Sequence, residues 1–300
     1  MRRHLIVLAL AAGATGAGVT AHLFTADGPQ RRSGTVVNAT ESIPSRRGAA
    51  VVEEAARPFD AAALRQAVRA YVRKRPGKAG VMATDLRTGL SFGENEKGRF
   101  VTASIVKVDI LATLVLQRQR DGRRLSGGER ELAGRMIRES DNSAADALYS
   151  DAGYGPGVRK ANKTFGLKQT KPFPTSWGSS LTSPADQVRL LANLASDRSP
   201  LKATGRQYIL GLMGSVLDEQ AWGVSAAARP GERVALKNGW APIHNQGNGW
   251  AINSVGRISG PGHDFLIAVC SGDNPTMETG VSTVEHVAGM VVGTMRGARP

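Results

Sequence analysis

The sequence predicts an α/β (α+β) fold: a five-stranded antiparallel sheet flanked by N- and C-terminal helices, with an all-helical subdomain inserted. Two short strand patterns, 79–86 and 90–93, follow the first helical pattern, and three more strand patterns lie near the end of the chain. A block of helical patterns separates the two groups. Because the strands come from both ends of the chain, the helical block must be an insertion within one sheet-containing domain.

The N-terminal region differs in composition from the rest. Two arginines near the start precede a stretch through Ala26 without Asp, Glu, Lys or Arg, so residues 1–26 are expected to be a signal peptide or an N-terminal membrane anchor. Residues 27–58 lack a sustained apolar period and are expected to be a flexible linker. The folded domain is predicted over 59–300, with the helical subdomain at about 103–196. These assignments predict a protein that is secreted or anchored on the outer face of the cytoplasmic membrane.

Composition narrows the function classes. The 300 residues are 41% hydrophobic, which fits a globular core, and the formal net charge of +14 favours anionic partners such as a membrane face or an acidic cell wall. No nucleic-acid-binding pattern is present, so no nucleic-acid partner is expected. The single cysteine, Cys270, excludes an intramolecular disulfide, and the histidines lack zinc-site spacing. We therefore predict no metal and no cofactor.

The individual elements follow from periodicity and from end signals. The first helix begins at a cap, Asp60, and ends before Pro76. A later helix begins with Ser183, Pro184 and Asp186, in the order of a cap, a first-turn proline and a first-turn acid. The other expected elements, in chain order, are helices near 104–120, 132–137, 144–149, 158–165 and 206–217, strands over 234–240, 250–259 and 264–271, and a helix over 284–295.

The most informative stretch for chemistry is the apolar helical run that begins at Ser104. Lys107 follows three residues later and therefore lies on the same helix face as the Ser104 hydroxyl. Its apolar neighbours would remove water from the ammonium group, which lowers the pKa and makes Lys107 a proton acceptor near neutral pH. Such a pair alone is common by chance. Asp109, in the same run, is interpreted as half of an internal ion pair.

Two further segments extend this pair. Ser140-Asp141-Asn142 occupies a short connection between helices, and Lys237-Asn238-Gly239 lies in the first strand after the helical block. In kind and order, these segments match the Ser-x-x-Lys, Ser-Asp-Asn and Lys-Thr-Gly elements of penicillin-recognising enzymes. The chain therefore resembles the class A β-lactamase-like serine hydrolases over about residues 59–295.

The resemblance implies four catalytic and four substrate-binding residues. Ser104 would be the acylated nucleophile, Lys107 its proton acceptor, Ser140 the hydroxyl that passes a proton to the leaving nitrogen, and Lys237 the cation that binds the substrate carboxylate and supports Ser140. The substrate-binding residues would be Asn142, Asn238, Gly239 and Trp240. By the same resemblance, the backbone N–H groups of Ser104 and Trp240 would form the oxyanion hole.

The chain departs from the family pattern at two places. Asn238 replaces the usual threonine or serine, which changes the hydrogen-bonding geometry expected around a substrate carboxylate. No Asp or Glu occurs between Asp151 and Asp186, where class A β-lactamases carry the glutamate that activates the hydrolytic water. We therefore expect acylation at Ser104 by β-lactams or related amides and esters, and doubtful deacylation.

Two alternatives remain open from the sequence. One is a peptidoglycan D,D-peptidase-like amidase or esterase, since such enzymes share the three motifs and deacylate without that glutamate. The other is a non-catalytic protein that binds wall fragments or antibiotics. In each case the expected partner is a small β-lactam or peptidoglycan-derived molecule, membrane contact is expected only through the N-terminus, and the chain is expected to be monomeric.

Overall fold

The computed structural model describes residues 57–243 and 249–299, so the predicted signal peptide or anchor and nearly all of the predicted linker lie outside the described residues. The helices are α1 (Ala61–Val72), α2 (Val106–Arg120), α3 (Gly127–Arg138), α4 (Asn142–Asp151), α5 (Tyr154–Phe165), α6 (Pro184–Ala195), α7 (Ala203–Met213) and α8 (Met277–Arg296), with 3-10 turns η1 (Ala103–Ile105), η2 (Trp177–Ser179), η3 (Asp218–Gln220) and η4 (Gly223–Ala227). The strands are β1 (Arg57–Pro58), β2 (Lys78–Asp85), β3 (Ser91–Glu94), β4 (Phe100–Val101), β5 (Leu181–Thr182), β6 (Arg233–Pro242), β7 (Trp250–Gly260), β8 (His263–Asn274) and β9 (Ala298–Arg299). Within this part of the chain, no helix has the length and apolar character needed to cross a membrane.

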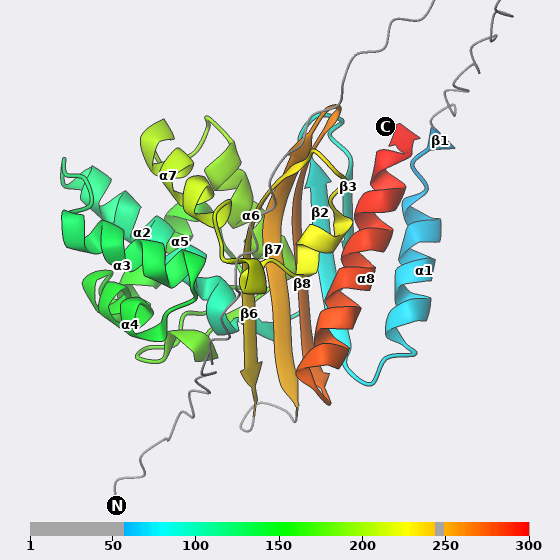
Figure 1. Cartoon of the computed structure of the whole chain (residues 1–300), viewed down its shortest axis with the longest axis horizontal. Coiled ribbons are helices and arrows are strands. Elements are labelled where there is room, and N and C mark those ends of the chain that lie inside the picture. Colours follow the sequence, from blue (N-terminus) through cyan, green and yellow to red (C-terminus); the bar gives the residue numbers. More distant parts are fainter. Residues whose placement is uncertain (1–56, 244–248, 300) are drawn as a thin grey trace, which may run out of the picture. The chain divides into compact units, whose positions relative to one another are not determined.

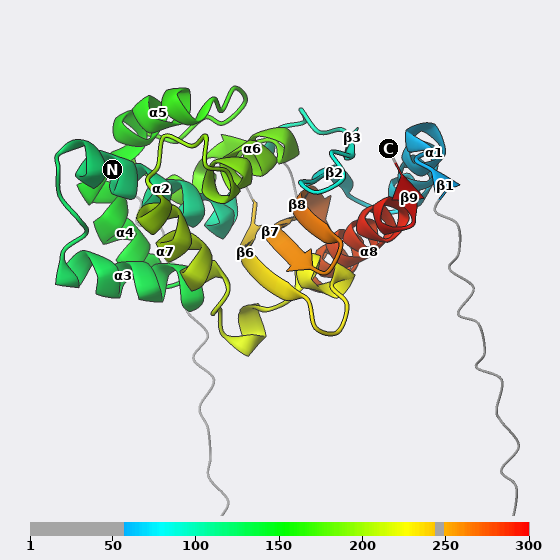
Figure 2. The ribbon, with the colours of Figure 1, turned by 90° about the horizontal axis from the view of Figure 1, so that it is seen from above.

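The central sheet confirms the predicted fold class. Its five strands are antiparallel neighbours in the order β3-β2-β8-β7-β6, so strands from both ends of the domain meet at the β2–β8 pair. The helices α1 and α8 cover one face of the sheet, and the group α2 to α7 lies on the other (Figures 1 and 2). Each face of the sheet has its own buried apolar cluster. The edge strand β6 borders the helical group, which brings Lys237 beside it.

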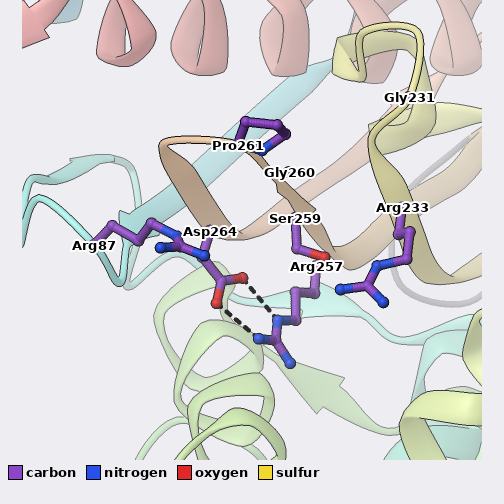
Figure 3. A pocket seen from close by; sticks show the side chains of 8 residues that line it. All are labelled: Arg87, Gly231, Arg233, Arg257, Ser259, Gly260, Pro261 and Asp264. Carbon is purple, nitrogen blue, oxygen red and sulfur yellow. Dashed lines mark hydrogen bonds and ion pairs between the residues drawn. The ribbon is translucent and has the colours of Figure 1, made fainter.

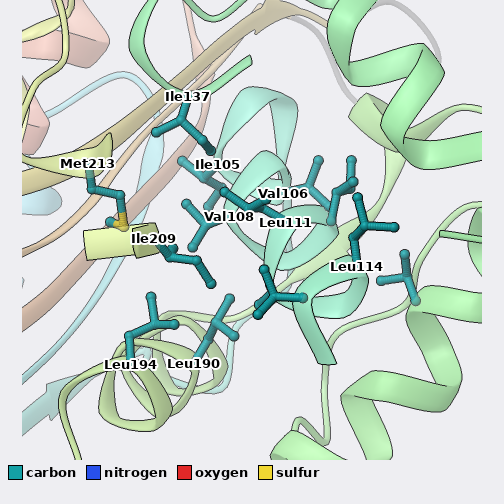
Figure 4. Packing of buried hydrophobic residues seen from close by; sticks show 14 of the residues in the cluster. Ile105, Val106, Val108, Leu111, Leu114, Ile137, Leu190, Leu194, Ile209 and Met213 are labelled. Carbon is teal, nitrogen blue, oxygen red and sulfur yellow. The ribbon is translucent and has the colours of Figure 1, made fainter. Parts of the chain in front are cut away.

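Helix α2 is the centre of the helical group, as its all-round apolar sequence predicts. Every residue from Val106 to Leu116 is buried. Side chains of α2 such as Leu111 and Leu114 pack among residues from α3, α6 and α7 (Figure 4). Truncation of one such leucine to alanine costs about 2 to 5 kcal/mol in a close-packed core. The start of the element differs from the prediction, because Ser104 lies on the 3-10 turn η1 that precedes α2.

The short strand pairs escaped prediction. Arg57–Pro58, which the sequence assigned to the linker, forms β1 and pairs in parallel with β9. Strand β4 pairs with β5 and so joins the segment before Ser104 to the segment before α6. Two-residue strands have no periodicity of their own, and their partners are more than 75 residues away in sequence.

The interpretation of Asp109 as part of an ion pair is wrong. Its carboxylate accepts a hydrogen bond from Asn162 Nδ2 at 3.0 Å, and no cation among the described residues pairs with it. Burial raises the pKa of Asp109 to about 7, because a charged carboxylate loses its hydration there. The buried oxygens Asp109 Oδ1, Thr113 Oγ1 and Asn162 Oδ1 have no hydrogen-bond partner within the described part of the chain.

Candidate active site

Ser104 lies where the segment after β4 turns into α2. Ala103, the residue before it, has a positive φ of 44°, a conformation that costs energy for a residue with a Cβ and that clusters at functional sites. The buried Asn253 on β7 donates through Nδ2 to the carbonyl oxygens of Val101 and Thr102, at 2.9 and 3.1 Å. These bonds fix the backbone just before Ser104, whose side chain is largely buried.

Strand β6 approaches the backbone of Ser104 closely. A Cβ added to Gly239 would lie 2.8 Å from the backbone nitrogens of Ser104 and Ile105 and 2.8 Å from the carbonyl oxygen of Thr102. Only glycine fits there without displacement of one backbone. The same approach brings the strand segment of Gly239 and Trp240 to the Ser104 backbone N–H, where the predicted oxyanion hole requires it.

Lys107 is fully buried one turn after Ser104. Its Nζ donates to the carbonyl oxygen of Ser140 at 2.7 Å, to Asn142 Oδ1 at 2.8 Å and to Ser140 Oγ at 3.2 Å. Burial lowers the pKa of Lys107 to about 7, and the negative charges of Asp141 and Asp146 oppose that shift. A lysine with this pKa is partly neutral near pH 7 and can accept a proton.

Ser140 Oγ lies between two lysine nitrogens. Besides the 3.2 Å contact with Lys107 Nζ, it accepts a hydrogen bond from Lys237 Nζ at 3.0 Å. Ser140 has a positive φ of 59°, and the next residue, Asp141, caps α4 by accepting the N–H of Ala144 at 2.9 Å. An ion pair between Asp141 and Arg135 anchors this turn to α3. The Ser140 hydroxyl is therefore placed to pass a proton between the lysines and a bound substrate.

Lys237 is fully buried on β6, and its Nζ also donates to the carbonyl oxygen of Asn238 at 3.0 Å. Burial holds the pKa of Lys237 well below its usual range, and the positive charge of Lys107 lowers it further. Two buried ammonium groups that share one hydroxyl disfavour simultaneous protonation. A negatively charged substrate group would restore the charge on Lys237, which suits this residue to carboxylate binding.

The structure brings together six of the predicted site residues through side-chain or close backbone contacts, namely Ser104, Lys107, Ser140, Asn142, Lys237 and Gly239. Within the described residues, Ser104 Oγ has no hydrogen bond to either lysine, a common feature of sites without substrate. The Trp240 side chain is partly exposed and packs edge-on against Trp222, with ring centroids 6.0 Å apart.

Asn238 does not join this cluster. Neighbouring side chains of a strand point to opposite faces, so Asn238 points away from the face that carries Lys237. Its Nδ2 donates to the carbonyl oxygens of Gln220 and Trp222, at 2.7 and 2.9 Å. The buried amide therefore ties β6 to the η3 and η4 turns, and its expected contact with a substrate carboxylate has no support in this geometry.

The loop between α5 and α6 covers Lys107 with an aromatic ring. Trp177 on η2 lies over Lys107 Nζ, which is 4.6 Å from the ring centroid. The indole Nε1 donates to Asp146 on α4 at 2.7 Å, and the Thr102 N–H donates to the carbonyl oxygen of Ser180 at 2.8 Å. These contacts fix the loop over the site, so that the Trp177 indole, and not a carboxylate, covers Lys107.

Asp186, the acid at the end of that loop, has a structural role. Asp186 is buried at the start of α6, where Ser183 caps the helix as predicted. Its carboxylate accepts the backbone N–H groups of Lys168, Gln169 and Thr170, at 3.0, 2.6 and 2.7 Å. These hydrogen bonds occupy the carboxylate oxygens and fix the backbone at the start of the loop.

Sequence reasoning missed three residues that build this site. Asn253 and Trp177 act through contacts between segments far apart in the chain, which no local pattern reports. Asp146 could have been found, because it lies one helical turn after Asn142 and therefore shares its face of α4. Within the described residues, no group of three or more His, Cys, Asp or Glu side chains could hold a metal ion.

Comparison with known proteins gives a consistent result. Residues 63–127 and 112–295 match a family model described as "Beta-lactamase enzyme family". No curated protein matches the sequence significantly.

Among solved structures, the fold is similar to PBP-A, with a TM-score of 0.69, 20% identity, and 80% of this chain and 97% of that chain covered. It is also similar to a class A β-lactamase from Mycobacterium abscessus, with a TM-score of 0.68, 20% identity, and 78% and 99% covered. The extended-spectrum β-lactamase TLA-1 gives a TM-score of 0.70 at 18% identity, with 78% and 98% covered. At these identities the likeness establishes a class A β-lactamase-like fold.

Proposed function

Since the chain belongs to the β-lactamase enzyme family, we propose that it is an exported serine hydrolase that β-lactams or related amides and esters acylate at Ser104, with slow release of the acyl group. One observation carries the proposal: Ser140 Oγ lies 3.2 Å from Lys107 Nζ and 3.0 Å from Lys237 Nζ. The Ser140 hydroxyl lies between two buried lysines, and one of them, Lys107, lies one turn after Ser104. Together these groups can provide both proton transfers that acylation needs.

Acylation would proceed in two proton transfers. Neutral Lys107 takes the proton of Ser104 Oγ as this oxygen attacks the carbonyl carbon and forms the new C–O bond. The negative charge on the carbonyl oxygen meets the backbone N–H groups of Ser104 and Trp240. The C–N bond then breaks, and the leaving nitrogen receives a proton through Ser140, which Lys107 reprotonates. Lys237 balances the substrate carboxylate during these steps.

Deacylation needs a base for the attacking water. The loop that faces the site has no carboxylate between Asp151 and Asp186, and the Trp177 ring covers Lys107. Among the described residues, the bases of this cluster are Lys107 and Lys237, and both are fully buried, so water has poor access to them. We expect an acyl-enzyme that forms readily and hydrolyses slowly.

Intact-mass analysis after brief exposure to benzylpenicillin tests the acylation step. The wild type should gain the mass of one penicillin, and Ser104→Ala should gain none. An unmodified wild type, or an equal adduct on Ser104→Ala, would contradict the proposal. Reversible binding with the same affinity in both proteins would indicate a non-catalytic binding protein.

A second candidate is a peptidoglycan D,D-peptidase-like amidase or esterase. The loop favours it, because such enzymes deacylate without the loop glutamate that class A β-lactamases use. Hydrolysis of peptides that end in D-Ala-D-Ala, measured against hydrolysis of nitrocefin, separates the two. Faster turnover of the peptide would favour the peptidase.

A further inference from the structure

We propose that a pocket at the start of β6, separate from the candidate active site, binds a phosphate group. The start of β6, the β7–β8 hairpin and the turn after β2 line this pocket of about 400 Å³ (Figure 3). Arg233 precedes Lys237 by four residues on β6, which separates pocket and catalytic cluster by about 13 Å along the strand. The pocket is therefore a separate site, and the proposal does not depend on the proposed function.

The charge of the pocket is positive. Its charged lining residues are Arg87, Arg233, Arg257 and Asp264, a net charge of +2. Arg257 is paired with Asp264 through two hydrogen bonds of 2.7 Å each. The remaining guanidinium groups lie on either side of that pair (Figure 3). Guanidinium groups stay charged at all physiological pH values, so this charge is permanent.

The acids near the pocket are already neutralised. Besides Asp264, two acids contact lining residues: Asp85, which accepts the Asp264 N–H and pairs with His263 at 2.7 Å, and Glu232, which borders Gly260 and pairs with Arg296. All three already have a side-chain partner within the fold, and none is left to balance the two remaining arginines.

Arg87 and Arg233 are the residues without a partner. Both are exposed, and neither forms an ion pair with any residue that the structure describes. Each reaches the pocket from a different segment, so their side chains approach a bound group from opposite sides. Two converging guanidinium groups in a polar hollow are a typical arrangement for an anion.

The geometry favours a phosphate over a single carboxylate. One guanidinium satisfies the two oxygens of a carboxylate, whereas a tetrahedral phosphate offers oxygens to groups on both sides and carries a matching charge near −2. The Ser259 hydroxyl provides another donor at the pocket wall. The pocket is several times larger than one phosphate, so the ligand class is a phosphomonoester or a pyrophosphate with room for a small organic group.

Calorimetric titration of the full chain with inorganic pyrophosphate at fixed ionic strength tests the proposal. The variant Arg87→Ala/Arg233→Ala should bind at least about tenfold more weakly than the wild type, as expected when two charge-assisted contacts are lost. The matched control is Arg73→Ala/Arg124→Ala, which removes two exposed arginines that do not line the pocket. It should bind as the wild type does.

Titration with citrate under the same conditions separates phosphate recognition from simple charge attraction, and it should give weaker binding than pyrophosphate. Circular dichroism spectra and urea unfolding midpoints that match those of the wild type show that both double variants are folded. The proposal would be overturned if the wild type did not bind pyrophosphate, or if both double variants lost the same pyrophosphate affinity. Equal wild-type affinity for citrate and pyrophosphate would also overturn it.

Discussion

Two parts of the candidate site are built differently: the cluster of Lys107, Ser140 and Lys237, and the loop between α5 and α6. Both lysines of the cluster are fully buried, their hydrogen bonds link α2 and β6 to the Ser140 turn, and burial lowers the pKa of both lysines. The loop offers no carboxylate and covers Lys107 with the Trp177 ring. Under the proposed function, acyl uptake and acyl release would therefore depend on separate parts of this fold, so that one could persist without the other.

The strongest test of the cluster is the replacement of Lys107. Lys107→Arg keeps a positive charge that cannot be lost, so it should slow acylation of Ser104 roughly 10²- to 10⁴-fold if the lysine acts as general base. Lys107→Ala should be as slow. Stopped-flow or quenched intact-mass measurements with benzylpenicillin give the rate, and a Lys107→Arg enzyme that acylates at the wild-type rate would refute the role of base.

The loop side can be changed in the opposite direction. Trp177→Glu puts a carboxylate over the site and should speed loss of the penicillin adduct by roughly 10²-fold, the low end for general-base catalysis. Trp177→Gln is the matched control, since it removes the same ring without adding a base. Equal release rates in these two variants would show that the ring, and not the absent base, limits release.

The pH profile of acylation sharpens the comparison further. Neutral Lys107 is the active form, so the acylation rate should fall roughly tenfold per pH unit below about pH 7 and level off above it. The charge of Asp146 raises the pKa of Lys107, so Asp146→Asn should move this limb to lower pH. Asp151→Asn, an exposed change at the end of the same helix, should leave it in place. A limb that Asp146→Asn leaves unmoved would contradict the electrostatic assignment.

The last prediction concerns Asp109 and tests stability instead of rate. Its pKa is raised from 3.8 to about 7 on folding, so the folded state retains a proton that the unfolded state has lost. As the pH rises from about 4 to about 7, the free energy of unfolding should therefore fall by about 1.4 kcal/mol per pH unit. Asp109→Asn should remove that contribution without slowing acylation. Urea titrations at pH 5 and pH 8 measure it, and equal pH dependence in both proteins would contradict it.

Much of the fold could be predicted from the sequence, because strong local patterns specify it. The apolar run of α2, the Ser183 cap and the three C-terminal strands are all such patterns. The order of the motifs around Ser104 also predicted which residues approach one another. These features depend on neighbours in sequence or on family order, and both are visible without coordinates.

The remainder depends on contacts that local patterns do not contain. The positive φ values at Ala103 and Ser140 follow from tertiary packing, since neither residue favours them. Asn238 was assigned to substrate by its place in the motif, but strand alternation points its side chain at the η3 and η4 turns. Trp177 reaches Lys107 across 70 positions of sequence, a contact that only the folded loop creates.

The fate of the penicillin adduct tests the central claim most directly. The wild type is acylated with benzylpenicillin, excess drug is removed, and intact mass is followed over time alongside the amount of released penicilloate. We predict an adduct on Ser104 that forms quickly and persists over many multiples of its formation time. An adduct that disappears as fast as it forms, with stoichiometric penicilloate, would show efficient deacylation and would contradict the account.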